Sequence, residues 1–595
     1  MKWFTKLSQR IKGLTNAIAR YPLTTAFLLA ATVIVAASIN AEKDYTKLLL
    51  TCAVGATLSA SLQAAYERFF SKVSTRIILM GGGGILLTLG YYLILRAAPE
   101  FSMETHIRTW IVLLALFLAF IWVPIIRSRI SFNESFMTAF KAFFHSAFYA
   151  IVIFAGCSLI IMAIDTLITD VNHKVYSHTA NIIFVLFTPL FFLSLIPVYP
   201  GRKDKDSDND KNSAQNELIN KAAFCPKFLE ILISYIIIPL TAVFTVILLL
   251  YIVLNIRGEF WTNNLLEPML VSYAIAVILI YILASRLENK FAILFRRIFP
   301  KVLVPIVLFQ ITASTLSMGD TGITHTRYFV ILFGIFAAFA GVVMSLLPVR
   351  RNGIIAAMLI AFCVVSVIPP IDAFTVSRIS QEKMLKSVLI QNKMLKNNVI
   401  IPDNSISDQD KKKIISFVEY LSMMDYTDKI EWFPDDFIIY EDFYNTFGFY
   451  EYGIPDTINR TVNVFLNSMT SIDIAGYDVL ARTNIHSEEN MESQICNIQK
   501  SGREYTLVKE KSKGEYDVIL MDDNKQELIR FNTDKIFSKY SSYATDKAEI
   551  SKDEATFSTE NERVKLTIVV QEAGINFASN QNFNYADFYI LVRFK

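Results

Sequence analysis

The chain has 595 residues, of which 53% are hydrophobic, 13% aromatic and 19% charged, and its mean hydropathy is +0.40. Soluble globular proteins carry about 25% charged residues, so the composition indicates a membrane protein. The formal net charge is only +3, and no block of lysine and arginine is large enough to predict a nucleic-acid-binding surface. The five cysteines form no C-x-x-C pair, so neither a metal site nor a cofactor is expected.

Residues 1–21 are predicted to form a cytoplasmic amphipathic segment. The segment is basic, like the start of a signal peptide, but no small-residue cleavage site ends the apolar run that follows it. Its apolar residues recur on one face, which is typical of a helix in the membrane interface. These residues are Trp3, Phe4, Leu7, Ile11, Leu14 and Ile18.

Apolar runs long enough to cross a bilayer follow one another from residue 22 to Pro369 and Pro370. A hydrocarbon core needs roughly 20 apolar residues per helix, and each span must be helical because unpaired backbone groups are not tolerated in lipid. We expect eleven spans, at approximately residues 22–40, 46–65, 77–95, 107–126, 142–164, 180–199, 228–254, 268–285, 302–318, 328–348 and 353–370.

A polar stretch divides these spans into two membrane bundles. Residues 201–227 begin with a sequence that is low in apolar residues and mixed in charge, which is typical of a disordered linker. We therefore expect a first bundle of six spans at residues 22–200, a cytoplasmic linker at 201–227, and a second bundle of five spans at 228–370.

The loops predict the orientation, because positively charged loops stay in the cytoplasm. Every second loop is basic: the basic groups precede span one and follow spans two, four, eight and ten. The loops between them are poorer in lysine and arginine. This alternation places the N-terminus in the cytoplasm, and an odd number of spans places residues 371–595 on the opposite, extracytoplasmic side.

Residues 371–595 are predicted to form a water-soluble α+β domain with a mainly antiparallel sheet. Helical periodicity covers residues 375–396 and 408–424, and the period falls to two from about residue 461. The expected strands, several of them joined by Asp, Asn, Gly and Lys turns, are 461–465, 505–509, 516–521, 527–532, 563–571 and 587–595.

An aromatic stretch at residues 432–452 lies between the predicted helices and the predicted sheet. Its side chains can line a ligand groove, pack against the membrane, or belong to a hydrophobic core. We favour the core, because large aromatic side chains dominate core energetics.

Four segments together resemble the bacterial family called "domain of unknown function 4153". They are YPLTTAFLLA in span one, PKFLEILISYIIIPLTAVFTVILLLYIV at span seven, GDTGITHTRYFVILFGIF at span ten, and IDAFTVSRISQEKMLKSVLIQNKMLKNNVIIP after span eleven. SIDIAGYDVL, at residues 471–480, is also similar to a segment of these proteins. The resemblance ends at about residue 480. It implies a bacterial inner-membrane protein, and it implies no activity. The loop charges then predict that residues 371–595 are periplasmic in a bacterium with two membranes and surface-exposed otherwise.

The external loop at residues 319–327 holds the best candidates for chemistry. Arg327 can grip a phosphate or carboxylate bidentately, and Asp320 or His325 can act as a base. The structural interpretation, which we prefer, is a glycine turn in which Arg327 and Asp320 pair and fix two helices. Together with Arg378, these residues form the candidate binding set. No catalytic residue is identified.

Other signals of chemistry are weak. The run Gly81–Gly84 is not followed by Lys-Ser/Thr, so it is no phosphate-binding loop, and metalloprotease, serine-hydrolase and dinucleotide motifs are missing from the sequence. Few ionisable residues lie at membrane depth, and each lies close enough to a helix end to reach water. Gln310 in span nine is expected to make a helix–helix hydrogen bond.

Three functions stay open, and the chain is not expected to be an enzyme. The first is an anchor: the membrane part positions an external domain that binds an envelope component or partner protein, for example by strand addition. The second is a transferase that acts on an anionic lipid-linked or glycolipid substrate. The third is a transporter, although internal repeats and a polar midplane cluster are missing from the sequence. Membrane lipids are expected partners in each case.

The space above spans nine and ten discriminates between the first two functions. An enzyme should gather Asp320, His325 or Arg327 with residues such as Asp372, Arg378 or Asp478 around a cavity open to lipid. An anchor should instead bury these groups in salt bridges.

Overall fold

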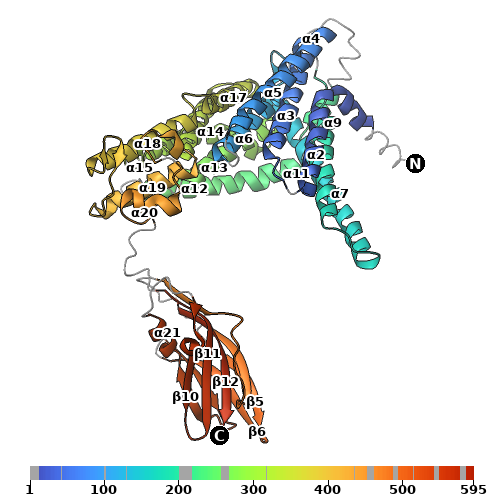
Figure 1. Ribbon diagram of the computed structural model, residues 1–595. Helices are drawn as coiled ribbons and strands as arrows, with labels where there is room; N and C mark the ends of the chain where they lie inside the picture. The colour runs from blue at the N-terminus through green and yellow to red at the C-terminus, as the bar shows by residue number, and fades with distance from the viewer. Residues whose placement is uncertain are drawn as a thin grey trace. The chain divides into compact units, whose positions relative to one another are not determined.

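The computed structural model describes residues 12–41, 43–98, 102–128, 130–199, 217–255, 267–316, 318–434, 436–451, 461–486, 493–512, 515–541, 549–576 and 584–595. The chain divides into two compact units (Figure 1). The first unit comprises Met1–Ile401 and Asp408–Ile439, and the second comprises Pro402–Ser407 and Tyr440–Lys595. Residues 12–20 are helical, whereas the first eleven residues of the predicted amphipathic segment lie outside the described part.

The first unit is a bundle of membrane helices, which confirms the polytopic class. Ten helical segments within the described residues are long and apolar enough to cross a bilayer. They are α2 (Pro22–Ala41), α3 (Thr46–Phe69), α4–η1–α5 (Val73–Ile78, Leu79–Leu86, Leu87–Ala97), α6–η2 (Met103–Trp122, Val123–Ile125), α7 (Phe132–Leu167), α8–η3–α9 (Lys174–Ala180, Asn181–Phe187, Thr188–Leu195), α11–η4–α12 (Lys227–Ile231, Leu232–Ile237, Ile238–Asn255), α13–η7 (Glu267–Leu283, Ala284–Arg286), α16 (His325–Leu346) and η8–α17 (Val349–Arg351, Gly353–Val367).

The expected ninth span lies in α14 (Lys290–Leu316), a helix that contains Pro300 and Pro305. α14 is not among the ten segments, so the count of eleven is not confirmed. Its packing is nevertheless that of an interior helix: Leu303, Val307 and Gln310 are fully buried. The side-chain amide of Gln310 donates to the carbonyl oxygen of Val330 in α16 at 3.5 Å, which agrees with the expected helix–helix hydrogen bond.

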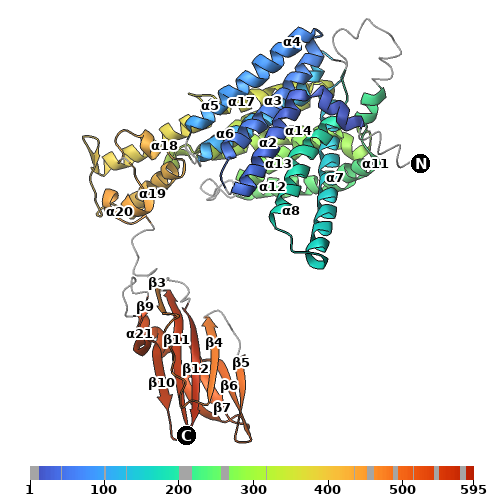
Figure 2. The same ribbon diagram turned by 45° about the vertical axis from the view of Figure 1, so that its right-hand side comes forward.

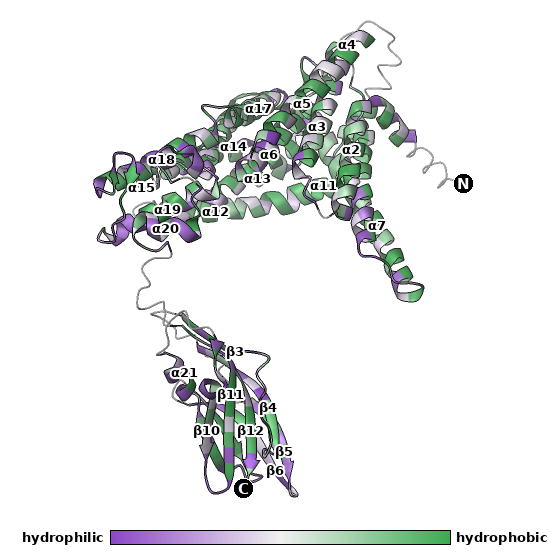
Figure 3. Cartoon of the chain, viewed as in Figure 1, coloured by the Kyte–Doolittle hydropathy of each residue, from purple (hydrophilic) through white to green (hydrophobic). Residues whose placement is uncertain are grey.

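The outer surfaces of the bundle are apolar, as a lipid environment requires. Figure 3 shows hydrophobic residues along most of α7 and α12. Phe148 of α7 is 63% exposed and Leu254 of α12 is 79% exposed. A contiguous exposed apolar surface of this kind marks a membrane contact rather than a water-facing surface.

The four-glycine run forms a π-helical segment, η1, where helices pack closely. A Cβ atom on Gly84 would lie 2.5 Å from Cδ2 of Leu23, and one on Gly83 would lie 3.1 Å from Cδ1 of Leu62. Leu23 belongs to α2 and Leu62 to α3. Gly83 and Gly84 therefore allow three spans to approach one another, whereas a Cβ atom on Gly81 or Gly82 would have no neighbour within 4 Å.

Two helices beyond the last span belong to the first unit. α18 (Ala373–Gln391) and α19 (Asp408–Met423) correspond to the two helices predicted after Pro370, and the hairpin of β1 (Leu395–Lys396) and β2 (Val399–Ile400) lies between them in the chain. The compact unit therefore extends to Ile439, whereas the apolar runs end at Pro370. The polar helices α18 and α19 pack on the ends of the membrane helices (Figure 1).

The second unit contains two sheets. The larger has the order β4–β12–β11–β3–β9, with β10 also paired to β11, and the smaller is the meander β5–β6–β7–β8 (Figure 2). All pairs are antiparallel except β3 with β9. The strands are β3 (Thr461–Leu466), β4 (Val479–His486), β5 (Ser493–Lys500), β6 (Arg503–Ser512), β7 (Glu515–Met521), β8 (Glu527–Asn532), β9 (Glu549–Ile550), β10 (Thr556–Glu560), β11 (Val564–Asn576) and β12 (Asn584–Phe594).

The two sheets share one hydrophobic core, so they form a sandwich. Val518 and Leu520 of β7 and Ile568 and Ile590 of the larger sheet are fully buried in the same cluster. The short helices α21 (Asp534–Ser541) and α22 (Lys552–Ala555) complete an α+β unit. All six expected strands are present, whereas β4, β5, β9 and β10 were not anticipated.

The aromatic stretch is mainly core. Its tryptophan and phenylalanine side chains are buried, namely Trp432, Phe433, Phe437, Phe443, Phe447 and Phe449. Tyr440, Tyr444 and Tyr450 are exposed, and Tyr452 lies outside the described residues. The tyrosines are exposed and the phenylalanines are buried because the tyrosine hydroxyl group can remain hydrogen-bonded to water, whereas the phenyl ring has no polar group.

Residues 402–407 belong to the second unit although the chain on both sides of them belongs to the first. The backbone N–H of Asp403 donates to the carbonyl oxygen of Phe447 at 3.0 Å. A Cβ atom on Gly448, whose φ is +82°, would lie 2.9 Å from the backbone nitrogen of Asp403. A glycine is thus required at 448 both by the φ angle and by the approach of this segment.

We predict that Gly341→Leu destabilises the membrane unit by about 1–3 kcal/mol, the usual cost of overpacking. A Cβ atom on Gly341 in α16 would lie 2.8 Å from Cγ2 of Val304 and 3.1 Å from the carbonyl oxygen of Pro300 in α14. Thermal unfolding of the purified protein in detergent measures the change. The matched control is Gly156→Leu in α7, where nothing lies within 4 Å of the added Cβ. Equal melting temperatures for the two variants would contradict the prediction.

Candidate functional site at the ends of the membrane helices

The first turn of α6 presents a charged pair. Ser102 caps the helix by accepting the backbone N–H of Thr105 at 3.4 Å. Glu104 and Arg108 follow four residues apart, so they lie on the same face. Nε of Arg108 donates to Oε1 of Glu104 at 2.8 Å, and the guanidinium lies 4.6 Å from the ring centre of Phe374 in α18.

Asp372 joins α18 to this pair. It is the N-cap of α18: its Oδ1 accepts the backbone N–H groups of Phe374 and Thr375 at 3.0 and 3.1 Å. The same oxygen accepts Nη2 of Arg108 at 2.7 Å. Nη1 of Arg108 also donates to the carbonyl oxygen of Val367, at the end of α17. Asp372 is fully buried, so its negative charge depends on this arginine and on the helix N-terminus.

His325, one of the sequence-predicted candidates, begins α16 and is buried under α18 and α19. Its Nδ1 lies 2.9 Å from the hydroxyl of Tyr420, which also accepts the backbone N–H of His325 at 2.9 Å. The imidazole stacks between the rings of Phe374 and Tyr420, at 6.1 and 5.8 Å. This histidine therefore works as a contact between helices and not as an open base.

Arg327, the second candidate, lies two residues further along α16 and is also buried. Its Nη1 donates to the hydroxyl of Thr321 and, at 3.3 Å, to the carbonyl oxygen of Gly322. The loop that it binds is also held by α18: Nε2 of Gln381 donates to the carbonyl oxygens of Thr321 and Ile323 at 2.9 and 3.2 Å.

The remaining sequence candidates are Asp320 and Arg378, together with Asp478 of the external domain. Asp320 lies in α15 (Met318–Thr321), but its side chain is outside the described part of the chain. Arg378 is half-buried on α18. Asp478 belongs to the second unit, where it pairs with Lys500 and accepts the backbone N–H of Phe594 at 2.8 Å. The hydrogen bond from Lys500, followed by the one from the backbone of Phe594, lowers the pKa of Asp478.

Sequence reasoning missed the residues that α19 and the following turn η9 (Thr427–Lys429) contribute. Nζ of Lys429 lies 3.7 Å from Oε2 of Glu104 and 4.9 Å from the ring centre of Tyr426. Burial, followed by the negative charge of Glu104, raises the pKa of Tyr426. Burial likewise raises the pKa of Tyr420. Only the tyrosines and charges near the predicted helix 408–424 could have signalled these contacts.

We call Glu104, Arg108, His325, Asp372, Tyr420, Tyr426 and Lys429 the junction cluster. Each of its charged or polar groups is engaged by another member or by backbone, and they join four helices. Within the described residues, no group of three or more His, Cys, Asp or Glu could hold a metal ion. The geometry is that of a structural clamp.

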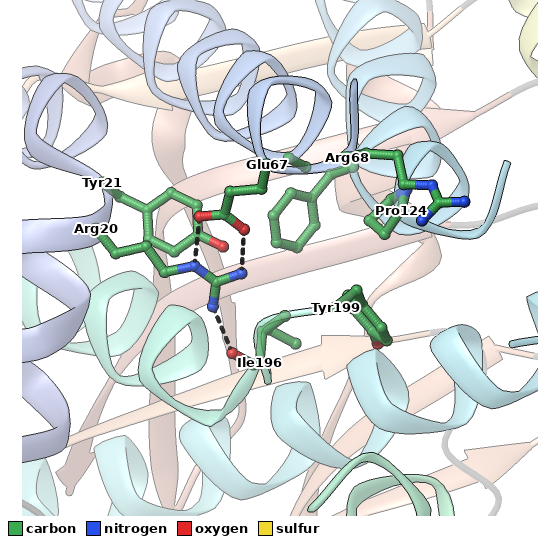
Figure 4. A pocket seen from close by; sticks show the side chains of 9 residues that line it. Arg20, Tyr21, Glu67, Arg68, Pro124, Ile196 and Tyr199 are labelled. Atoms are coloured by element: carbon green, nitrogen blue, oxygen red, sulfur yellow. Dashed lines mark hydrogen bonds and ion pairs between the residues drawn. The ribbon is translucent and has the colours of Figure 1, made fainter. Parts of the chain in front are cut away.

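A second, half-buried ion pair lies at the opposite ends of the helices. Nε and Nη2 of Arg20 donate to the two carboxylate oxygens of Glu67 at 2.9 and 2.7 Å, and Nη1 donates to the carbonyl oxygen of Ile196 at 2.7 Å (Figure 4). A small cavity of about 10 Å³ lies beside the pair, which is room for one water molecule. Burial raises the pKa of Tyr21 and of Tyr199 in its lining.

A model of the family described as "Domain of unknown function (DUF4153)" matches residues 23–399. The matched stretch contains the membrane helices and α18, and it includes Glu104, Arg108, His325 and Asp372 of the junction cluster. Neither the curated proteins nor the solved structures contain a match to the chain.

We predict that Arg108→Ala destabilises the protein by about 3–5 kcal/mol, because it leaves the fully buried carboxylate of Asp372 without its counter-charge. Denaturation of the detergent-solubilised protein measures the loss. Lys221→Ala is the control, since its ion pair with Glu217 is exposed on both sides and should contribute less than about 1 kcal/mol. A cost for Arg108→Ala no larger than that of the control would contradict the prediction.

We predict that the stability of the first unit falls above pH 10 and that Tyr426→Phe weakens this fall. The folded state raises the pKa of Tyr426 above the ordinary 10.0, so the stabilisation is complete below pH 10 and is lost as the pH rises towards the folded value. At pH 11 one such tyrosine costs about 1.4 kcal/mol relative to neutral pH. Melting temperatures from pH 8 to 11 measure it. The exposed Tyr440→Phe is the control, and identical pH profiles for the two variants would be inconsistent with this origin.

Proposed function

The chain belongs to the DUF4153 family, and we propose that its membrane helices anchor an extracytoplasmic C-terminal domain that binds an envelope component or partner protein. The observation that carries the proposal is the junction cluster. Of the groups best suited to chemistry near these helix ends, His325 and Asp372 are buried and Arg108 is half-buried. Arg108 pairs with Asp372, and His325 is bonded to Tyr420 of α19. An anchor needs such a clamp, whereas an enzyme needs those groups to face a substrate.

The proposed placement is the plasma membrane of a bacterium, with the N-terminus in the cytoplasm and the sandwich outside. The alternation of basic loops supports this orientation. The helix contacts support it too: Arg108, His325 and Asp372, which come from loops predicted to be outside, lie together. Arg20, Glu67 and Ile196, which come from ends predicted to be inside, also lie together.

The second unit has the surface that the proposal requires. It is a sandwich with its own core, so it can present its faces and strand edges without support from lipid. Its sequence departs from the family model, which ends at residue 399.

We predict that a photo-reactive amino acid at Met469 captures one discrete envelope component in living cells, because this side chain is 94% exposed on the second unit. The matched position is Ile379 on α18 of the first unit, which is 54% exposed and should yield no such product. Gel-shifted adducts, identified by mass spectrometry, provide the measurement.

Two outcomes would count against the anchor. One is the lack of a reproducible adduct at Met469 and at the exposed Leu480. The other is an anionic polyprenyl-phosphate lipid that co-purifies with the wild type in native mass spectrometry and is lost in an Arg327→Ala, Asp320→Ala double variant. That result would favour the transferase.

A further inference from the structure

His325 lies at a contact of three helices that is largely closed to solvent. Its imidazole is buried and stacks between the rings of Phe374 in α18 and Tyr420 in α19. Both of these rings are buried as well. The seat of α18 and α19 on the end of α16 therefore depends on one side chain that can take up a proton.

The hydrogen bonds of this imidazole fit its neutral form. The hydroxyl of Tyr420 accepts the backbone N–H of His325 at 2.9 Å, so its own hydrogen can be donated to Nδ1 of the ring, also at 2.9 Å. We therefore assign the ring hydrogen to Nε2, which lies 3.3 Å from Oγ1 of Thr326. A second hydrogen, on Nδ1, would turn this acceptor into a donor and break the bond from the Tyr420 hydroxyl.

The surroundings also disfavour a positive charge on the ring. His325 is the first residue of α16, where the helix dipole places positive charge. Arg327 is buried two residues further on, and the guanidinium of Arg108 already lies 4.6 Å from the centre of the Phe374 ring. Burial adds the cost of removing a charge from water.

Nearby negative charge is already used by other partners. Arg108 pairs with the carboxylates of Glu104 and Asp372, and Lys429 also lies beside Glu104. Among the described residues, no contact of His325 involves a carboxylate. The charged and titratable groups that the packed elements contribute here are Glu104 and Arg108 of α6, Arg327 and Tyr328 of α16, Asp372 and Arg378 of α18, Tyr420 of α19, and Tyr426 and Lys429 after it.

We propose that His325 is a pH-sensitive latch: its neutral imidazole holds the last turn of α19 on α16, and a proton on the ring releases it. Release of Tyr420 also loosens the turn η9, whose Lys429 contacts Glu104. The pair of Arg108 and Asp372 still holds the first turn of α18, so the junction opens on the side of α19. The latch goes beyond the proposed anchor and takes from that proposal only the side of the membrane on which pH is sensed.

Proton linkage gives the sign and the upper limit of the effect. A released imidazole in water has the ordinary pKa of about 6.5. For a seated ring that takes up no proton, release becomes at most about thirtyfold more favourable between pH 7.5 and pH 5.0. Acid therefore opens the latch, and a return to neutral pH closes it.

The test is hydrogen exchange, followed by mass spectrometry, of the full-length protein in nanodiscs at pH 7.5 and pH 5.0. Exchange times are scaled for the intrinsic pH dependence of amide exchange. We expect exchange in residues 417–429 of the wild type to rise at least fivefold at pH 5.0, and exchange in α13 and β11 to stay constant. In His325→Gln, which cannot take up the proton, the change should be less than twofold. His173→Gln is the matched control, because His173 is exposed, and it should respond as the wild type does.

A second variant keeps the test decisive where His325→Gln is unfolded at pH 7.5, as its melting temperature would reveal. His325→Phe retains a ring between Phe374 and Tyr420 and should likewise lose the response to acid. The latch is overturned if exchange in residues 417–429 of the wild type is the same at both pH values, or if the folded His325 variants keep the wild-type response. An equal rise in α13 and β11 would also overturn it, because acid would then unfold the whole chain. None of these outcomes alters the capture at Met469, so the anchor is tested separately.

Discussion

Asp372 is fully buried, and a buried carboxylate strongly destabilises a fold unless a positive partner compensates it. Arg108 supplies it from α6 and also holds the last carbonyl of α17 and the ring of Phe374. This ion pair therefore holds the ends of α6, α17 and α18 together. α18 begins at Asp372, so the direction in which the chain leaves the last span is set by an ion pair, and α19 then packs on α18.

A similar arginine–carboxylate pair lies at the other ends of the helices. There Arg20 binds Glu67 and also the carbonyl oxygens of Ile196 and Pro197. Arginine suits both places because its planar group binds a carboxylate and unpaired helix-terminal carbonyls together. Between the two layers the helices are joined mainly by apolar packing, which has little directional preference in lipid. The polar ends therefore supply much of the register of the bundle.

Much of this arrangement could be predicted from the sequence. The apolar runs predicted most spans to within a few residues, because the bilayer dictates both their length and their helical form. Two helices differ more: α7 (Phe132–Leu167) begins well before the expected span 142–164, and α14 (Lys290–Leu316) begins well before the expected span 302–318. The two-residue periodicity of the sequence after residue 461 predicted six of the strands. Strands β4 and β5 escaped notice because VLARTNIH and SQICNIQK lack a regular apolar alternation. The contacts of His325 and Asp372 could not be predicted from the sequence. Their partners, Tyr420 and Arg108, lie far away in the sequence, and only the fold brings them together.

The segment at residues 402–407 has a consequence for how the two units can be separated. Because it belongs to the second unit while both of its flanks belong to the first, the chain passes between the units three times. A single protease cut after Ile439 would leave residues 440–595 with no covalent link to the first unit, and a fragment that starts at Tyr440 would lack residues 402–407, whose Asp403 bonds to Phe447. A pulling force on the C-terminus therefore reaches the first unit through one covalent connection, at Ile439, whereas residues 402–407 are held to the second unit by non-covalent contacts such as the Asp403–Phe447 hydrogen bond.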